Sequence, residues 1–323
     1  MHTVWQWIVL VLCVTASLWG VGALYYDAGQ QTRWGLFWGA LWLLSTILLF
    51  SLVTPFWLAT ALFAGAFAIL LAWWFSQKPS HDRDWDPNFS RLPRMRVEGD
   101  AVTVTNVRNT RYRSLEDYDL RHETRTYALS ELKAVDVLVL FWGSPYICHP
   151  MAIFDFGNDQ HLCISIEVRY RKNDHYGVLQ GLYRQNELIY LVSDERDAIW
   201  RRTKHAEGQD FYLYRLQKDP GFVRQLFDGY MESINRIFEQ PKWYHTLTSN
   251  CTTSIYFQRK GQIPWDWRML FNGSFEKMLY DWGRLEQRLP FEELKKRSHI
   301  NQAANASSAA DFSQKIRHGR PGF

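Results

Sequence analysis

The distribution of apolar and charged positions divides the chain into two unlike parts. From Met1 to Tyr26, and again from Trp34 to Gln77, the sequence contains no Asp, Glu, Lys or Arg. A helix needs roughly 20 mostly apolar residues to cross a bilayer, so the first stretch is long enough for one span and the second for two. Thr54-Pro55 marks the turn between these two, because proline readily ends a helix. The pattern predicts a three-helix transmembrane anchor over residues 1–77, followed by a soluble domain over residues 78–323.

The apolar part has two other interpretations. The first stretch could be a cleaved signal peptide, but it has no basic start and no small-residue cleavage site. The second could be a buried hairpin of a soluble core, but such a long uncharged stretch is not typical of one. Tryptophans also lie near the proposed helix ends, as in an interfacial aromatic belt. These are Trp5, Trp7, Trp34, Trp38, Trp73 and Trp74.

Charge gives a prediction for the orientation in the membrane. Three spans place the short loop 27–33 and the large domain on the same side. This side carries Arg33, Lys78 and Arg83, so the positive-inside rule predicts a cytoplasmic domain. That prediction depends on only three charges, and long domains translocate largely regardless of charge. The net charge of +4 implies modest attraction to anionic lipid and gives no indication of nucleic-acid binding.

Strand patterns dominate the first half of the soluble domain. Two short strands flank Glu98-Gly99-Asp100, which is typical of a hairpin. A long apolar run predicts a buried strand, and two runs separated by residues 157–160 predict a second hairpin. The predicted strands are Met95–Val97, Ala101–Asn106, Leu132–Trp142, His149–Phe156, His161–Val168, Glu187–Ser193 and Asp210–Leu216.

Helical patterns come later. Asp219-Pro220 supplies an N-cap and a first-turn proline, and apolar residues then recur at helical spacing until Pro241. Ser249-Asn250 could cap a second helix that runs to about Arg259. The Ala-, Asn- and Ser-rich stretch Asn301–Ala310 is typical of a flexible loop. Meandering strands followed by segregated helices predict an α+β fold.

Cys251 is the residue that most suggests chemistry. At a helix N-terminus, unpaired amides and the helix dipole stabilise a thiolate and lower the pKa of the thiol. Such a nucleophile also needs a base, usually a histidine brought close by the fold. The alternative is that Cys251 is a small buried hydrophobe, the commoner fate of a lone cysteine. The three cysteines of the soluble domain are an odd number, which leaves at least one free thiol.

The second predicted hairpin supplies candidate bases. His161, Cys163, Ser165 and Glu167 alternate with apolar residues, so they share one face of a strand. The position of His149 depends on the pairing register. If Phe156 pairs with His161, His149 lies on the apolar face. If a bulge or a five-residue loop makes Asp155 pair with His161, His149 joins His161 and Glu167.

Several blocks of this sequence resemble the Lnb family, which includes bacterial lipoprotein N-acyltransferases. The first block runs from His149 to Gly157 and continues through His161, Ser165, Glu167 and Arg169; the second runs from Pro241 to Thr253. Shorter blocks are Gly181–Tyr183, Glu187–Tyr190, Asp194–Asp197, Asp311–Ser313 and Ile316-Arg317. The family is similar to permuted papain-like or NlpC-like thiol enzymes, in which His precedes Cys. The lecithin:retinol acyltransferase family has the same order.

The resemblance implies roles for particular residues. Cys251 would be the nucleophile and His149 the base, while His161 would orient that base or replace it. Residues implied in substrate binding or support are Asn250, Ser165, Glu167, Arg169 and Thr252. His245 departs from the family pattern, where Asn is expected.

The function implied is a membrane-bound acyltransferase with its catalytic domain on the periplasmic face of the bacterial inner membrane. It would move a fatty acyl chain from a phospholipid, through a thioester, to the N-terminal amine of a diacylated lipoprotein. No cofactor is expected, and no metal, because Cys148, His149, His161 and Cys163 lack the spacing of a structural zinc site. The alternatives are a thiol peptidase or amidase acting on cell-wall peptide, and a non-enzymatic membrane scaffold.

Overall fold

The computed structural model describes residues 3–29, 32–172, 174, 177, 179–250, 266–269 and 272–323. The chain divides into two compact units, each built from three segments. The helical unit comprises Met1–Asp82, His175–Glu187 and Trp243–Thr246. The sheet unit comprises Arg83–Asp174, Leu188–Lys242 and Leu247–Phe323.

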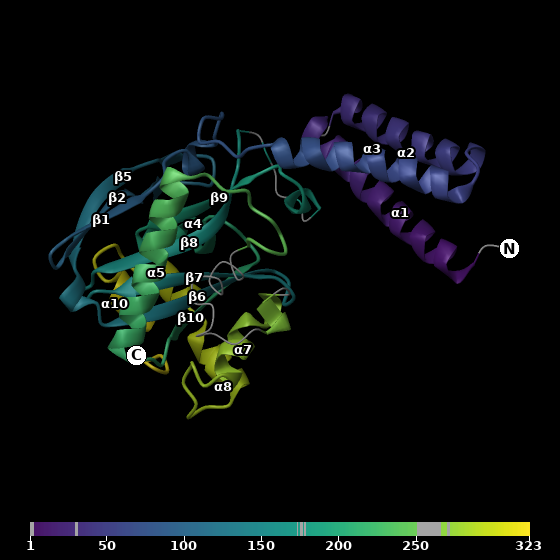
Figure 1. Cartoon of the computed structure of the whole chain (residues 1–323). Helices are drawn as coiled ribbons and strands as arrows, with labels where there is room; N and C mark the ends of the chain where they lie inside the picture. Colours follow the sequence, from purple (N-terminus) through teal and green to yellow (C-terminus); the bar gives the residue numbers. More distant parts are fainter. Residues whose placement is uncertain are drawn as a thin grey trace. The chain divides into compact units, whose positions relative to one another are not determined.

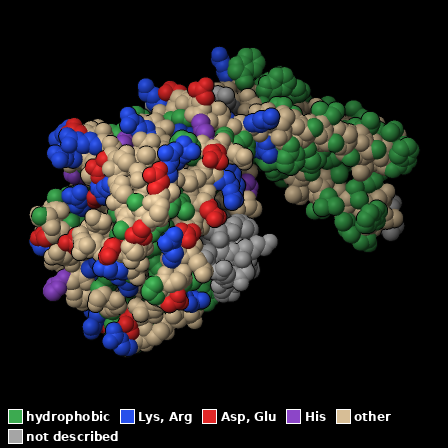
Figure 2. Space-filling view, turned by 60° about the vertical axis from the view of Figure 1, so that its left-hand side comes forward, with side chains coloured by type: hydrophobic (Ala, Val, Ile, Leu, Met, Phe, Trp, Pro, Cys, Tyr) green, Lys and Arg blue, Asp and Glu red, His purple; other side chains and the backbone are tan. Residues whose placement is uncertain are grey.

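The helical unit contains the three predicted helices. They are α1 (Val4–Ala23), which continues as a π-helical turn (Leu24–Ala28), α2 (Arg33–Leu52) and α3 (Phe56–Ser76). All three are long and apolar enough to cross a membrane. Large apolar side chains cover their outer surface, whereas charges of both signs are scattered over the sheet unit (Figure 2). Outward-facing apolar side chains are favourable in lipid and costly in water, which supports the interpretation as spans.

Small residues and polar bonds join the helices. Gly35 of α2 leaves no room for a side chain, because an added Cβ would lie 2.6 Å from the carbonyl oxygen of Tyr25. The indole of Trp42 donates to the carbonyl of Ser17 at 3.2 Å. Close approach at small residues and interhelical hydrogen bonds are typical of helix packing in membranes.

Two later segments of the chain complete the helical unit. Tyr183 lies against Gly22, where an added Cβ would be only 1.8 Å from the phenol oxygen, and its ring stacks on Tyr26 with centroids 5.0 Å apart. Arg184 donates to the carbonyl of Gln77 at 2.7 Å. The main-chain amide of Thr246 bonds to the carbonyl of Gly181 at 2.7 Å.

The sheet unit is built on one eight-stranded sheet. Its order is β1-β2-β9-β8-β7-β6-β10, with β5 also paired to β2. The strands are β1 (Arg94–Glu98), β2 (Ala101–Arg108), β5 (His122–Ala128), β6 (Ala134–Trp142), β7 (Cys148–Asp155), β8 (His161–Arg169), β9 (Glu187–Ser193) and β10 (Gln209–Arg215). A separate pair consists of β3 (Arg111–Tyr112) and β4 (Tyr118–Asp119).

Helix α5 (Pro220–Glu239) covers one face of this sheet (Figure 1). Asp219 caps it as predicted, its carboxylate accepting from the amide of Phe222 at 2.9 Å. The ring of Phe227 packs edge-on against Phe154 and Phe156 of the sheet, with centroids 5.1 and 5.5 Å away. The face of β7 that carries Phe154 is therefore the apolar face described by the sequence pattern.

Short helices cover the other face. They are α4 (Glu195–Thr203), α9 (Asn301–Asn305) and α10 (Phe312–Arg317), while α7 (Phe275–Asp281) and α8 (Phe291–Ser298) lie near β10 and the end of β6 (Figure 1). Met151, Ile153 and Cys163 pack here against Ile199, Phe312 and other buried residues. A sheet between two helical layers confirms the α+β class. The prediction of a flexible loop over Asn301–Ala310 is wrong in part, because α9 forms there and buries Ala304.

The β7–β8 register decides which side chains share this second face. Asp155 pairs with His161 and Met151 with Ser165. Five residues form the connecting loop, in which Gly157, Asn158 and Asp159 all have positive φ. His149 therefore shares a face with His161 and Glu167, and the same register places Glu167 opposite His149.

Candidate active site

His149 lies in a buried cluster with the two polar residues opposite it. Its Nε2 is 2.6 Å from the hydroxyl of Ser165 and 3.0 Å from Oε1 of Glu167. The hydroxyl of Ser165 in turn donates to the same Glu167 oxygen at 2.6 Å. A proton on Nε2 is therefore stabilised by oxygen acceptors, and in that tautomer Nδ1 carries the ring's lone pair. This arrangement of imidazole, hydroxyl and carboxylate orients a histidine for proton transfer.

The electrostatics of this cluster favour an ionised carboxylate. Burial alone would raise the pKa of Glu167, but the charge and hydrogen bond of His149, with Arg202 and Ser165, hold it well below its usual range. Glu167 is therefore negative at neutral pH and stabilises positive charge on the imidazole, as a carboxylate does in a catalytic triad.

Two contributors to this site were missed by the sequence analysis. The ring of Trp142, the last residue of β6, lies 5.9 Å from that of His149 and restricts its orientation. Arg202 of α4 supplies the second positive charge near Glu167. Trp142 ends an apolar run, and Arg202 belongs to a helix that was not predicted, so neither carried a local signal.

His161 belongs to a different cluster. It lies opposite Asp155, six residues along β7 from His149, which is about 20 Å of strand. Its Nε2 is 3.7 Å from Asp155, and its Nδ1 is 3.6 Å from Glu195. The prediction that His161 orients His149 does not fit this geometry, because sharing a strand face does not bring the two rings together. Ser165 and Glu167 occupy the orienting position instead.

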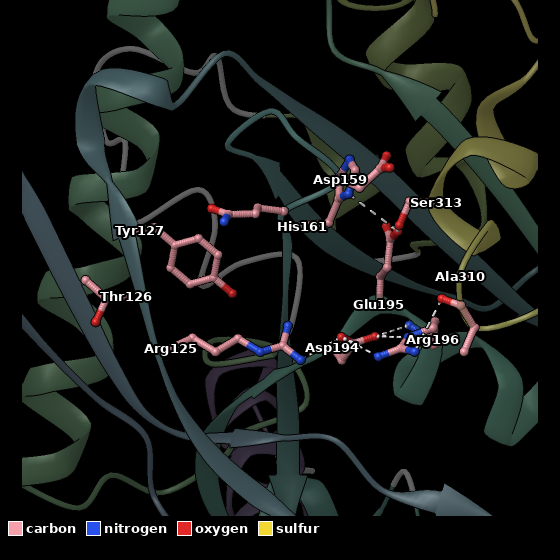
Figure 3. Close-up of a pocket in the computed structure, with 12 residues that line it drawn as sticks. Arg125, Thr126, Tyr127, Asp159, His161, Asp194, Glu195, Arg196, Ala310 and Ser313 are labelled. Atoms are coloured by element: carbon pink, nitrogen blue, oxygen red, sulfur yellow. Dashed lines mark hydrogen bonds and ion pairs between the residues drawn. The ribbon is translucent and has the colours of Figure 1, made fainter.

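The surroundings of His161 are polar and charged (Figure 3). Arg317 donates to Glu195 at 2.8 Å and also to the fully buried Asp136 at 2.9 Å. Burial would raise the pKa of Glu195, but Arg317 and His161 lower it overall. This network joins β6, β8, α4 and α10.

Arg169 has a supporting role in the described structure. Its guanidinium stacks on the ring of Trp85 at 4.0 Å and donates to the carbonyls of Phe89 and Ser90 at 2.9 and 2.8 Å. The side chain is almost fully buried. These contacts fasten the segment that precedes β1 to the end of β8, so Arg169 is better explained as a structural residue than as a substrate ligand.

The described cysteines differ from a reactive thiol. Cys163 is buried in the core beneath α4, and this burial raises the pKa of its thiol far above the ordinary value. Cys148 is also fully buried. A raised thiol pKa disfavours the nucleophilic thiolate, so Cys163 is a core residue.

Cys251 and Thr252 lie outside the described residues, as does the helix predicted to begin there. Asn250, at the end of the described stretch, is buried. His245 belongs to the helical unit, where partial burial lowers the pKa of its imidazole. Among the described residues, no group of three His, Cys, Asp or Glu side chains is arranged to hold a metal ion.

The chain combines apolar helices that are long enough to cross a membrane with a mixed α+β sheet unit. These two features define a membrane protein with one large polar domain. Residues 118–272 match the Lnb N-terminal periplasmic domain, which is consistent with an Lnb-type family. The match contains His149, Ser165, Glu167 and Cys251, and it confirms the resemblance. No curated protein and no solved structure matches the chain.

The family match also bears on orientation. Its members' domain is periplasmic, which is the opposite of the side that Arg33, Lys78 and Arg83 predict. Three charges next to a domain of this size are a weak constraint, because large domains translocate largely regardless of charge. The sheet unit fits a periplasmic domain.

Proposed function

We propose that this protein is a membrane-bound acyltransferase that carries a fatty acyl chain on Cys251 from a phospholipid to the amine of a lipoprotein. The observation that carries the proposal is the buried His149–Ser165–Glu167 cluster. Thiol acyltransferases need an oriented base that both removes and returns protons, and a neutral core histidine would not need an ionised carboxylate beside it.

The chemistry proceeds in two half-reactions. His149 takes the proton of Cys251, and the thiolate attacks an ester carbonyl of the phospholipid. A C–S bond forms and the C–O bond breaks, while the proton passes from His149 to the departing lysophospholipid alcohol. The free α-amine of a diacylated lipoprotein then attacks the thioester, forming an amide and releasing the thiol. The amine proton returns through His149, so no external oxidant, reductant or cofactor is required.

Exposed apolar side chains beside His149 support a lipid as the acyl donor. The loop between β6 and β7 presents Tyr146, which is 80% exposed, and Ile147, which is half exposed. Gly273 packs on the backbone of this loop, and the exposed Trp267 belongs to the adjacent turn. Clustered exposed aromatic and aliphatic residues mark a surface that contacts lipid or protein, and aromatic rings favour the bilayer interface.

We further propose that the sheet unit is a permuted papain-like domain, with its base on a strand and its nucleophile later in the chain. The protein would sit in the bacterial inner membrane through three spans, with the sheet unit in the periplasm. Both substrates are then embedded in the same bilayer as the enzyme, which supports lateral rather than aqueous delivery.

Mass spectrometry of an acyl-enzyme tests the proposal. Purified full-length protein incubated with phospholipid is expected to gain one fatty acyl mass on the peptide containing Cys251, and hydroxylamine is expected to remove it. Adding a diacylated lipopeptide should discharge the thioester and yield the N-acylated product. Cys251→Ala should abolish both steps, while Cys163→Ala, a matched change in the core, should leave the site of acylation unchanged.

The same experiment separates the alternatives. A thiol peptidase would release fragments from cell-wall peptide without a stable acyl adduct. A non-enzymatic scaffold would give neither product. N-acylation of the lipopeptide by purified Cys251→Ala protein would contradict the proposal.

A further inference from the structure

A pocket lies at the far end of the β7–β8 pair from His149. It has a volume of about 400 Å³ and is lined by β5, the β7–β8 loop, the start of α4 and the segment before α10. In Figure 3, Tyr127 and Arg125 lie on one side of it and His161 and Glu195 on the other, with Asp194 between Arg125 and Arg196. The sequence blocks around residues 194–197 and 311–317, which the proposed reaction does not use, meet here.

The carboxylates of the pocket are already satisfied by cations of the chain. Asp194 accepts from Arg125 at 2.7 Å and from Nε and Nη2 of Arg196 at 2.8 and 3.1 Å. Glu195 accepts two bonds from Arg317, at 2.8 and 3.1 Å, and one from Ser313. Neither carboxylate therefore has much capacity left to accept bonds from a ligand.

Two other buried groups of the pocket have hydrogen-bonding capacity that the described part of the chain does not use. The hydroxyl of Tyr127, a residue only 3% exposed, lies next to the guanidinium of Arg125, and its proton has no acceptor. Nδ1 of His161, which is 7% exposed, also makes no hydrogen bond, since the nearest carboxylate oxygen, of Glu195, is 3.6 Å away. The ring of Tyr127 is held in place by stacking on Phe156, with centroids 4.5 Å apart. Buried polar groups are nearly always paired, so two orphans lining one pocket indicate a missing ligand.

The unused groups are suited to an acceptor-bearing ligand. Burial raises the pKa of the Tyr127 phenol, so it remains a proton donor at neutral pH. Arg125 and Arg196 both line the pocket and add positive charge, although each already pairs with Asp194, and the positive end of the α4 dipole lies there. The carboxylate of Asp159 opposes an anion, but it already accepts from Gln314 at 2.8 Å. We propose that this pocket binds a small oxyanion, a carboxylate or phosphate group, through Tyr127, His161 and Arg125.

This site does not depend on the proposed acyl transfer. About 20 Å of strand separates it from His149, so a ligand here would not contact the reacting atoms.

Calorimetric titration of the full-length protein in detergent tests the inference, with inorganic phosphate in one series and succinate in another. Saturable binding of at least one is expected, and the tighter one identifies the oxyanion class. Tyr127→Phe should weaken binding about 10-fold, the usual effect of losing one hydrogen bond to a charged group. Tyr212→Phe, a matched change on β10, should bind like the wild type.

Stability supplies a second readout. Because Tyr127→Phe removes a buried hydroxyl whose proton has no acceptor, the ligand-free variant should melt at the same temperature as the wild type or higher. A clearly lower melting temperature would mean that the hydroxyl has a partner in the protein, and the proposal would fail. Absence of saturable binding to both oxyanions, or wild-type affinity in Tyr127→Phe, would also overturn it.

Repeating the titration in phosphatidylglycerol nanodiscs identifies the source of the oxyanion. Unchanged phosphate affinity supports a soluble ligand. Weaker apparent affinity supports occupation of the same pocket by a lipid phosphate.

Discussion

At the scale of single residues, Glu167 carries the charge on which the His149 cluster depends. Glu167→Gln keeps the shape but removes the charge that stabilises a protonated imidazole. Loss of an orienting carboxylate can cost up to about 10⁴-fold in a triad, and with Ser165 still present we expect about a 10²-fold fall in the rate of Cys251 acylation. Acyl-enzyme formation followed by mass spectrometry measures this rate. Glu131→Gln, a matched change at an exposed position, should retain the wild-type rate.

The same carboxylate predicts a dependence of stability on pH. Its pKa is lowered by folding, so its stabilisation is complete above the unfolded value of about 4.3 and is lost as pH falls toward the folded value. The difference in melting temperature between wild type and Glu167→Gln should therefore shrink as the pH falls below about 4. A difference that grows on acidification would contradict this assignment.

The sequence predicted which residues contribute to the site, but it left open the register of the β7–β8 hairpin, which decides how they are grouped. Alternation along β8 correctly placed His161, Cys163, Ser165 and Glu167 on one face. The face on which His149 lies depends on the β7–β8 loop, in which three residues have a left-handed backbone conformation. No local pattern specifies that a non-glycine pair such as Asn158-Asp159 adopts this conformation. Alternation also says nothing about distance along the strand, so it did not reveal that His161 and His149, which share a face, lie in separate clusters.

At the scale of elements, α5 is the main support of the apolar face of the sheet. Phe227→Ala removes a ring that packs against both Phe154 and Phe156 and leaves a cavity under the helix. Such truncations cost about 3–5 kcal/mol, so the melting temperature should fall by several degrees. Arg224→Ala on the exposed side of α5 breaks only a surface ion pair with Asp228 and should cost less than about 1 kcal/mol.

The loop between β6 and β7 should affect the binding of the lipid substrate rather than the rate of the chemical step. Tyr146→Ser combined with Ile147→Ser removes exposed apolar area without touching the core. We expect a higher KM for phospholipid in mixed micelles, an unchanged kcat and an unchanged melting temperature. Leu115→Ser, at another exposed apolar position, serves as the control and should leave KM unchanged. A fall in kcat alone would argue against a lipid-contacting role.

Long periodic elements were predictable and short ones were not. The apolar spans, the hairpins and α5 could be predicted from the spacing of their hydrophobic residues, since each repeats its pattern over many residues. The missed elements include β5, α4, α8 and α10, which are short and rich in polar residues. Their local preference is weak, and packing on the sheet decides their structure.

At the scale of the whole molecule, the side of the membrane is the property on which the proposed function depends. An alkaline phosphatase fused after Phe323 should be active if the sheet unit is periplasmic, because that enzyme needs an oxidising compartment. A fusion of green fluorescent protein at the same position serves as the reciprocal reporter. If the green fluorescent protein fusion is fluorescent and the phosphatase fusion is inactive, the sheet unit lies in the cytoplasm, as the basic residues predict.

The three-segment construction of the helical unit has a consequence for biosynthesis. Its spans leave the ribosome first, but Tyr183 and Thr246 belong to segments made much later. Domains usually fold as they are synthesised, from the N-terminus onward, so this bundle stays unfinished until most of the sheet unit has emerged. A secreted fragment beginning at residue 83 would likewise carry two segments stripped of their helices. Neither part of the chain can be completed, or cleanly removed, without the other.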